Sequence, residues 1–184
     1  MRDLVVTENI SVDGVLEGDF YVRAGEFEGG ADVDDALREQ RERADALLVG
    51  RATFEAFRGY WPEQRDDPSG TSEYLNADSK YVVSTTLTAA DLGWKHTTVL
   101  RSLGDVRSLK EQEGADIVAT GSITLVHSLI DAGLVDEYRL FTYPVVVGDG
   151  RRLFTDRPAE LELVASTPFR SGVVLLRYRP SASG

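Results

Sequence analysis

Short apolar runs rich in β-branched residues alternate along this chain with segments in which apolar residues recur at helical spacing. The runs predict strands at residues 4–10, 46–49, 80–84, 97–100, 116–119, 135–143, 161–166 and 172–178. Residues 46–49 and 117–119 are apolar at every position, which is typical of strands buried on both faces of a parallel sheet. The pattern therefore predicts a sheet covered by helices.

Helices are predicted between these strands, at residues 34–44, 51–58, 105–112 and 122–132. In the last of them Ser122 can cap the first turn, and Gly133 can supply a left-handed turn at the end. Segments 18–32 and 59–79 predict long loops. The final two strands have no helix between them, which predicts an antiparallel hairpin at the sheet edge.

The order of these elements predicts an α/β protein with a mixed, mostly parallel central sheet and a C-terminal antiparallel hairpin. We expect a single domain over residues 1–180, followed by a frayed tail at 181–184.

Composition and charge narrow the possible functions. A formal net charge of -11 argues against a nucleic acid or an anionic membrane as partner. The chain has no cysteine and only two histidines, so we expect no disulfide, no cysteine nucleophile and no metal site. No run is long and apolar enough for a membrane span or a secretory signal, which predicts a cytoplasmic protein. Any phosphate-bearing ligand then has to be held by local features, against a repulsive overall field.

Two turns supply such features. The buried strand 46–49 runs into Gly50, Arg51 and Thr53 at the start of a helix, and the strand 116–119 runs into Thr120, Gly121 and Ser122. A helix start presents unpaired amides and a partial positive charge, and a glycine lets an anion approach the backbone. Each turn alone could simply connect a strand to a helix. In a parallel sheet, however, both helix starts lie at the same edge and could hold one pyrophosphate.

Further hydroxyls and an arginine follow the two neighbouring strands. Ser84, Thr85 and Thr86 come after one of them, and Arg101 and Ser102 after the other. Such groups suit a phosphomonoester, although either strand end could also be an ordinary solvated turn. Neither glycine turn has the G-x-G-x-x-G fingerprint, which disfavours an ordinary Rossmann domain.

The order and spacing of these segments resemble dihydrofolate reductases from Met1 to about Tyr178. The segments 9–14, 133–137 and 143–150 are similar to the reductase domain of bacterial riboflavin biosynthesis and its stand-alone relatives. The resemblance implies a dihydrofolate-reductase-like, three-layer α/β/α fold and NADPH as cofactor. It assigns the cofactor to one set of residues: Gly50, Arg51, Thr53, Ser84, Thr85, Arg101, Ser102, Thr120, Gly121 and Ser122.

The resemblance also implies the residues of the substrate side. Asp13 or a water molecule is the expected proton donor and Asp34 a second candidate, although an aspartate at a helix start is commonly a cap. The expected substrate contacts are Asn9, Ser11, Trp61 and Tyr143, of which Trp61 could equally anchor its loop on the core. The family further implies a cis peptide bond before Gly121.

The expected function is hydride transfer from NADPH to a small heterocyclic or sugar-derived substrate, as in 5-amino-6-(5-phosphoribosylamino)uracil reductase. Three alternatives stay open: dihydrofolate reductase activity, a non-catalytic nucleotide-binding domain, and a structural subunit with a degenerate site. The stand-alone relatives and the apolar stretch 138–147 also predict a homodimer.

Overall fold

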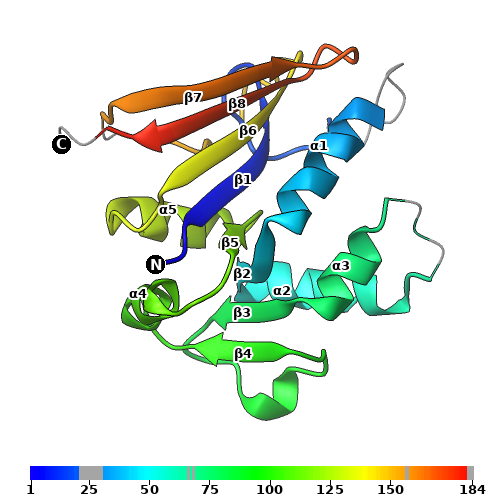
Figure 1. Ribbon diagram of the computed structural model, residues 1–184, viewed down its shortest axis with the longest axis vertical. Coiled ribbons are helices and arrows are strands. Elements are labelled where there is room, and N and C mark those ends of the chain that lie inside the picture. Colours follow the sequence, from blue (N-terminus) through cyan, green and yellow to red (C-terminus); the bar gives the residue numbers. More distant parts are fainter. Residues whose placement is uncertain (21–30, 66, 68, 156–157, 182–184) are drawn as a thin grey trace.

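An eight-stranded sheet forms the centre of the computed structural model, which describes residues 1–20, 31–65, 67, 69–155 and 158–181 (Figure 1). The strand order across the sheet is β4-β3-β2-β5-β1-β6-β8-β7. The bounds are β1 Leu4–Ser11, β2 Ala44–Gly50, β3 Ser79–Val83, β4 Thr97–Leu100, β5 Asp116–Ala119, β6 Glu137–Tyr143, β7 Leu161–Pro168 and β8 Val174–Pro180. Strands β1 to β6 pair in parallel, whereas β8 pairs antiparallel with both β6 and β7. The α/β class, the mostly parallel sheet and the C-terminal hairpin are thus confirmed.

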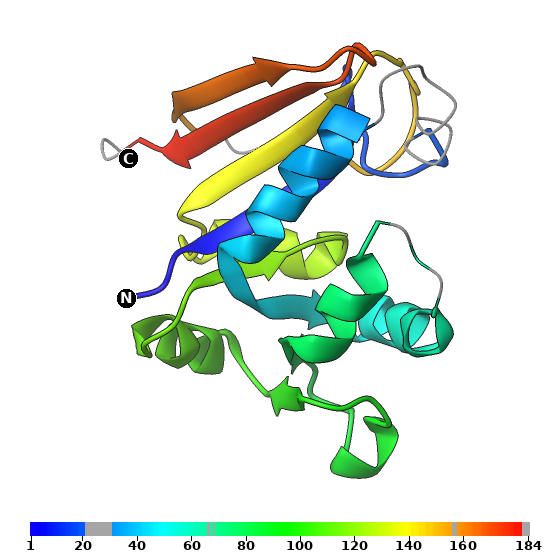
Figure 2. The same cartoon turned by 45° about the vertical axis from the view of Figure 1, so that its right-hand side comes forward.

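Helices cover both faces of the sheet, which gives three layers (Figures 1 and 2). Their bounds are α1 Ala31–Glu42, α2 Arg51–Arg58, α3 Thr71–Ala77, α4 Leu103–Glu111 and α5 Ile123–Asp131, with short 3-10 turns at Trp61–Glu63 and Ala89–Asp91. Helices α4 and α5 pack in one core cluster, and α2 and α3 in a second on the opposite face; α1 contributes to a third. No helix in the described ranges is long and apolar enough to cross a membrane.

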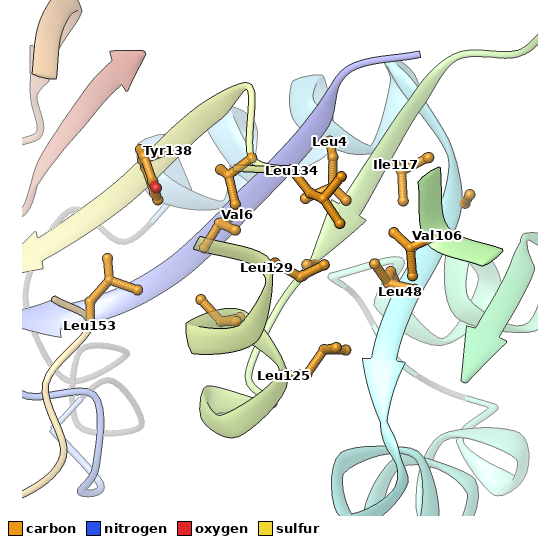
Figure 3. Packing of buried hydrophobic residues seen from close by; sticks show 14 of the residues in the cluster. Leu4, Val6, Leu48, Val106, Ile117, Leu125, Leu129, Leu134, Tyr138 and Leu153 are labelled. Atoms are coloured by element: carbon orange, nitrogen blue, oxygen red, sulfur yellow. The ribbon is translucent and has the colours of Figure 1, made fainter. Parts of the chain in front are cut away.

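Alternation along the buried strands explains the two main cores. In β2, Leu48 packs with α4 and α5, while its neighbours Leu47 and Val49 pack with α2 and α3. Successive side chains of a strand point to opposite faces, so a strand that is apolar throughout serves both cores. Figure 3 shows Leu48 beside Leu125 and Leu129 of α5 in the first core.

The segment predicted as a loop at 59–79 contains a helix that the sequence analysis missed. Helix α3 has seven residues, and Gly70, which precedes it, adopts a left-handed conformation (φ +70°). The Asp67 carboxylate accepts hydrogen bonds from the backbone amides of Ser69 and Ser72, which organises the chain before the helix. Leu75 is buried against the second core. One apolar anchor in seven residues is too weak a periodic signal to predict a helix.

The start of the first helix also differs from the prediction. Helix α1 begins at Ala31, three residues before the predicted start at 34, so Asp34 lies inside its first turn. Most of the predicted loop 18–32 and the tail residues 182–184 lie outside the described residues. Ser181 is described, and its amide donates a hydrogen bond to the carbonyl of Glu160.

A buried ionic cluster lies where the parallel part of the sheet meets the antiparallel part, between β6 and β8. Arg139 of β6 lies directly opposite Arg177 of β8, a pairing that would be repulsive alone. The Glu137 carboxylate, 1% exposed, accepts hydrogen bonds from both, at 2.7 and 2.8 Å. Burial raises the pKa of Glu137, but the hydrogen bonds from Arg177 and Arg139 outweigh this and hold the pKa below its usual range. Each buried charge is therefore paired, as its desolvation requires.

The apolar stretch 138–147 mainly fills the domain's own core. Tyr138, Leu140 and Phe141 are buried, whereas Val146 and Val147 are exposed. The exposed part is smaller than the sequence pattern indicated, and the homodimer stays a prediction.

Candidate functional site

The two glycine turns meet at the carboxyl edge of the sheet and are joined by hydrogen bonds. The Gly50 amide donates to the Ser122 hydroxyl at 2.9 Å, and the Ser122 amide donates to the Thr53 hydroxyl at 3.1 Å. The prediction that the Ser122 side chain caps α5 was wrong. Its hydroxyl instead accepts the hydrogen bond from the Gly50 amide at the start of α2. The result is one rigid unit that holds the starts of α2 and α5 beside each other.

A cleft of about 270 Å³ opens over this unit. The first amides of α2 and α5, beyond those already used, have no acceptor within their own helices and carry the positive ends of the two helix dipoles. We call this the glycine-turn cleft; it is lined by Glu8, Leu16, Gly50, Arg51, Ala52, Thr53, Gly121, Ser122, Ile123, Thr124, Leu125 and Arg151. Such a surface favours an anionic group, despite the acidic composition of the whole chain.

Gly121 is the one position of this cleft where glycine is needed on conformational grounds. Its φ is +57°, and Ser122 follows with φ +52°. A Cβ at Gly121 would lie 3.4 Å from the Thr53 Cγ2, an ordinary contact distance, so the left-handed backbone is what favours glycine here. Gly50 differs, because its backbone is extended (φ −82°). The cis peptide implied before Gly121 was wrong: no cis bond occurs in the described chain, and two consecutive left-handed residues turn the backbone instead.

A chain of polar contacts continues from the cleft toward β4. The Arg51 guanidinium donates to the Thr86 hydroxyl at 2.9 Å, and Thr86 lies 3.4 Å from the Ser84 hydroxyl. Arg101 donates to the Ser84 carbonyl at 2.8 Å. The structure thus brings Arg51, Ser84 and Arg101 into one ridge along the sheet edge.

The two remaining residues assigned to this end play different parts. The Ser102 hydroxyl accepts from the Asp105 amide at 3.2 Å and so caps α4. Thr85 is exposed at the end of β3.

A second cavity, of about 460 Å³, adjoins the glycine-turn cleft and is mainly apolar. We call it the apolar pocket; it is lined by Thr7, Glu8, Asn9, Leu16, Leu37, Gln40, Arg41, Leu47, Phe57, Trp61, Thr71, Tyr74, Leu75, Val118, Thr120 and Gly121. Glu8, Leu16 and Gly121 line both cavities, so they mark the junction between them. The volume is within the range of small-molecule sites.

Glu8 is the most unusual group at this junction. Its side chain is 7% exposed, and its Oε1 has no hydrogen-bond partner among the described residues. Burial raises the pKa of Glu8 to about 8, an effect that the backbone amide of Gly121 partly offsets. The carboxyl group is therefore mainly protonated at neutral pH, which makes it a hydrogen-bond donor.

Asp13 has the opposite character. Its carboxylate accepts hydrogen bonds from the Ser11 hydroxyl at 2.6 Å and from the Val147 and Gly148 amides at 3.1 and 2.8 Å. These bonds, that from Ser11 first, lower the pKa of Asp13 to about 2. An ionised carboxylate with this many donors is poorly suited to give up a proton. The Ser11 hydroxyl also accepts a hydrogen bond from the Val15 amide. Asp13 and Ser11 thus connect the loop after β1 to the loop after β6.

The other predicted substrate-side residues divide into two groups. Asn9 and Trp61 line the apolar pocket, and Trp61 packs edge-on against Phe57. Asp34 is exposed in the first turn of α1 and does not line either cavity; the α1 residues that do are Leu37, Gln40 and Arg41. Tyr143 is buried in the third core cluster, away from both linings, and burial raises its pKa to about 12.

Two residues of the cavity linings, Glu8 and Arg41, were not predicted from the sequence. Glu8 did give a signal, because it is an acidic residue inside a strand whose other positions are mostly apolar. Arg41 lies in a mostly charged helix, where periodicity does not mark the buried face. Within the described ranges, no group of three or more acidic or histidine side chains could hold a metal ion.

The fold and this site together define a dihydrofolate-reductase-like α/β protein in which two helix starts meet at one edge of the sheet. The chain belongs to the RibD C-terminal domain family, whose model matches residues 2–175. It is 31% identical over 185 residues to the uncharacterized protein YyaP of Bacillus subtilis (strain 168), an alignment that covers 96% of this chain and 94% of that protein.

Two solved structures show the same fold. A putative riboflavin biosynthesis protein from Shewanella sp. PV-4 is 18% identical and superposes with a TM-score of 0.76, over 98% of this chain and 99% of the other. Dihydrofolate reductase from Enterococcus faecalis, solved in a complex with NADP(H), is 16% identical with a TM-score of 0.64, over 97% and 96% of the two chains. The predicted resemblance and fold class are thereby confirmed.

Proposed function

We propose that this protein is an NADPH-dependent reductase of a small heterocyclic or sugar-derived substrate. One observation carries the proposal: two helix starts, joined by hydrogen bonds and turned at a glycine with a left-handed backbone, open directly beside an apolar pocket. An anionic cofactor and a planar substrate could thus occupy adjoining cavities. The relatives named above support the same activity, since they include a protein complexed with NADP(H).

The chain's own residues would bind and orient the cofactor. The free amides of α2 and α5 would hold the pyrophosphate, with Gly121 against it. Arg51 donates hydrogen bonds to Glu55 and Thr86 in the structure, and would turn its guanidinium to the 2′-phosphate. Arg101, at the other end of the ridge, would contribute a second positive charge. When bound, the cofactor supplies a hydride.

The apolar pocket would bind the substrate. Phe57, Trp61 and Leu47 offer apolar surface for a planar ring, while Asn9 and Gln40 offer amides at its edge. A substrate resembling 5-amino-6-(5-phosphoribosylamino)uracil carries both a ring and a phosphate, and Arg41 is the cation in the lining that could meet the phosphate.

Isothermal titration with NADPH and NADH tests the cofactor, followed by a screen of NADPH oxidation against pterins, the riboflavin pyrimidine and quinones. We expect tighter binding of NADPH, because the 2′-phosphate adds a charge-assisted contact. Equal affinities would refute the preference for NADPH. Binding without oxidation of any substrate would favour a nucleotide-binding domain, and failure to bind would favour a structural subunit.

Arg51→Ala is expected to weaken NADPH binding about three- to tenfold while changing NADH binding less, since an exposed charge-assisted contact contributes only modestly. Titration of both cofactors into the variant measures the two losses. Arg107→Ala, which removes an exposed arginine of α4 outside both cavities, is the matched control. An equal loss for NADPH and NADH would reassign Arg51 to the pyrophosphate.

A further inference from the structure

Glu8 lies where the two cavities meet, which is where a reaction between their two occupants would take place. It shares the lining of both with Leu16 and Gly121. The carboxyl group is buried at the carboxyl end of β1, and its Oε1 lacks a partner among the described residues. A buried polar atom without a hydrogen-bond partner destabilises the fold. Its position between two cavities therefore indicates that a bound ligand supplies the missing hydrogen bond.

No cation in the two linings neutralises Glu8, because each arginine there is engaged elsewhere. Arg41 donates to the Ser69 carbonyl at 2.8 Å and lies over the Tyr74 ring. Arg51 pairs with Glu55 at 2.8 Å.

The third arginine, Arg151, pairs with Glu17 at 2.7 Å. The remaining titratable group that faces the apolar pocket is Tyr74 of α3. Burial raises its pKa still further above neutral pH, so Tyr74 is uncharged. Neutral, protonated Glu8 is therefore the state that this environment favours.

Building on the proposed function, we propose that Glu8 is the catalytic acid, which gives its proton to the substrate atom bonded to the carbon that accepts the hydride. Asp13 and Asp34 do not compete for this role: the first is held ionised by three donors, and the second lines neither cavity.

The Glu8 proton would accompany the transfer of a hydride to the substrate. For a substrate with a C=N bond, the carbon would accept a hydride, with its electron pair, from the bound cofactor, which would be oxidised. The π electrons of that bond move to the nitrogen, which takes the proton from the Glu8 Oε1–H group. The products are an amine, the oxidised nicotinamide and the Glu8 carboxylate, which regains its proton from water. The nitrogen becomes more basic as the hydride arrives, so a weak acid at this position is sufficient.

Binding of a planar probe tests the acid without requiring turnover. Isoquinoline has two fused rings and one basic nitrogen, and is titrated from ~pH 6 to ~pH 10 into the wild type and Glu8→Gln. For the wild type we expect an affinity that is constant below about pH 8 and then falls about tenfold per pH unit, because binding then requires uptake of a proton. Glu8→Gln keeps a hydrogen-bond donor but cannot ionise, so its affinity should stay constant above pH 8.

Reduction of 7,8-dihydropterin, which contains a C=N bond, tests the proton transfer itself. We expect Glu8→Gln to lower kcat about 10²- to 10⁴-fold while the Kd for NADPH is unchanged. Glu111→Gln, which changes an exposed glutamate of α4, is the control for both measurements.

Each result decides the matter. No binding of isoquinoline to the wild type, an affinity that does not change with pH, or the same decline in Glu8→Gln would overturn Glu8 as the acid and leave NADPH binding intact. A Glu8→Gln variant that reduces dihydropterin at the wild-type rate would likewise overturn Glu8 as the acid. If NADPH does not bind at all, the proposed function fails, and the role of Glu8 in reduction fails with it.

Discussion

Between about pH 4.5 and pH 8 the wild-type protein is expected to lose roughly 4–5 kcal/mol of unfolding free energy that a Glu8→Gln variant retains. The Glu8 pKa is about 8 in the folded chain, against 4.5 for an ordinary glutamate. In this window the folded state therefore binds more protons than the unfolded state, so stability must fall as the pH rises. The contribution of neutral Glu8 is complete below pH 4.5 and is lost as the pH rises through 8.

Urea denaturation at several pH values measures this effect as the difference between the two proteins. Carboxylates with lowered pKa values, such as Asp13 and Glu17, act at lower pH with the opposite sign, but they are common to both proteins and cancel. Glu111→Gln serves again as the control and should follow the wild type. A wild-type curve parallel to that of Glu8→Gln across the whole window would show that Glu8 titrates normally, and would remove the physical basis for its role as an acid.

Gly121→Val is expected to weaken NADPH binding about 10- to 100-fold. The new Cβ would lie 3.4 Å from Thr53 Cγ2, and the branched side chain would extend from the turn where the pyrophosphate is proposed to bind. The residue would also be forced into a left-handed conformation, at a cost of roughly 1–2 kcal/mol to the fold. Isothermal titration measures the affinity, and thermal unfolding measures the stability.

Gly133→Val separates strain from steric exclusion. Gly133 has φ +62°, nearly the same as Gly121, but a Cβ there meets no atom within 4 Å. It lies after α5, at the end remote from the glycine-turn cleft. The two variants should thus lose similar stability, and Gly121→Val alone should lose NADPH binding. If Gly121→Val binds NADPH as tightly as the wild type, the cofactor does not bind at this turn.

The sequence predicted that the two glycine turns meet at one edge of the sheet, because their position depends on local order. A glycine after a buried strand and before a helix places amides at the sheet edge wherever the strand lies, and parallel pairing brings two such edges together. Gly50, Arg51, Thr53, Gly121 and Ser122 accordingly line one cleft. The way in which the turns join is not local: the hydrogen bond from Gly50 to Ser122 spans 72 residues and replaces the cap expected from sequence.

The side-chain roles near the substrate were decided by the tertiary structure. Asp13 and Glu8 are both carboxylates of the first fifteen residues, and composition does not distinguish them. Asp13 accepts hydrogen bonds from the amides of Val147 and Gly148, which lie 134 and 135 residues away in the chain. Glu8 instead lies between two cavities and has no cation paired with it there. The order of the strands, and of the helices other than α3, was therefore determined by the sequence through the periodicity of apolar residues. Which carboxyl group keeps its proton was determined only by folding, because a pKa depends on the dielectric environment and the donors that distant segments bring together.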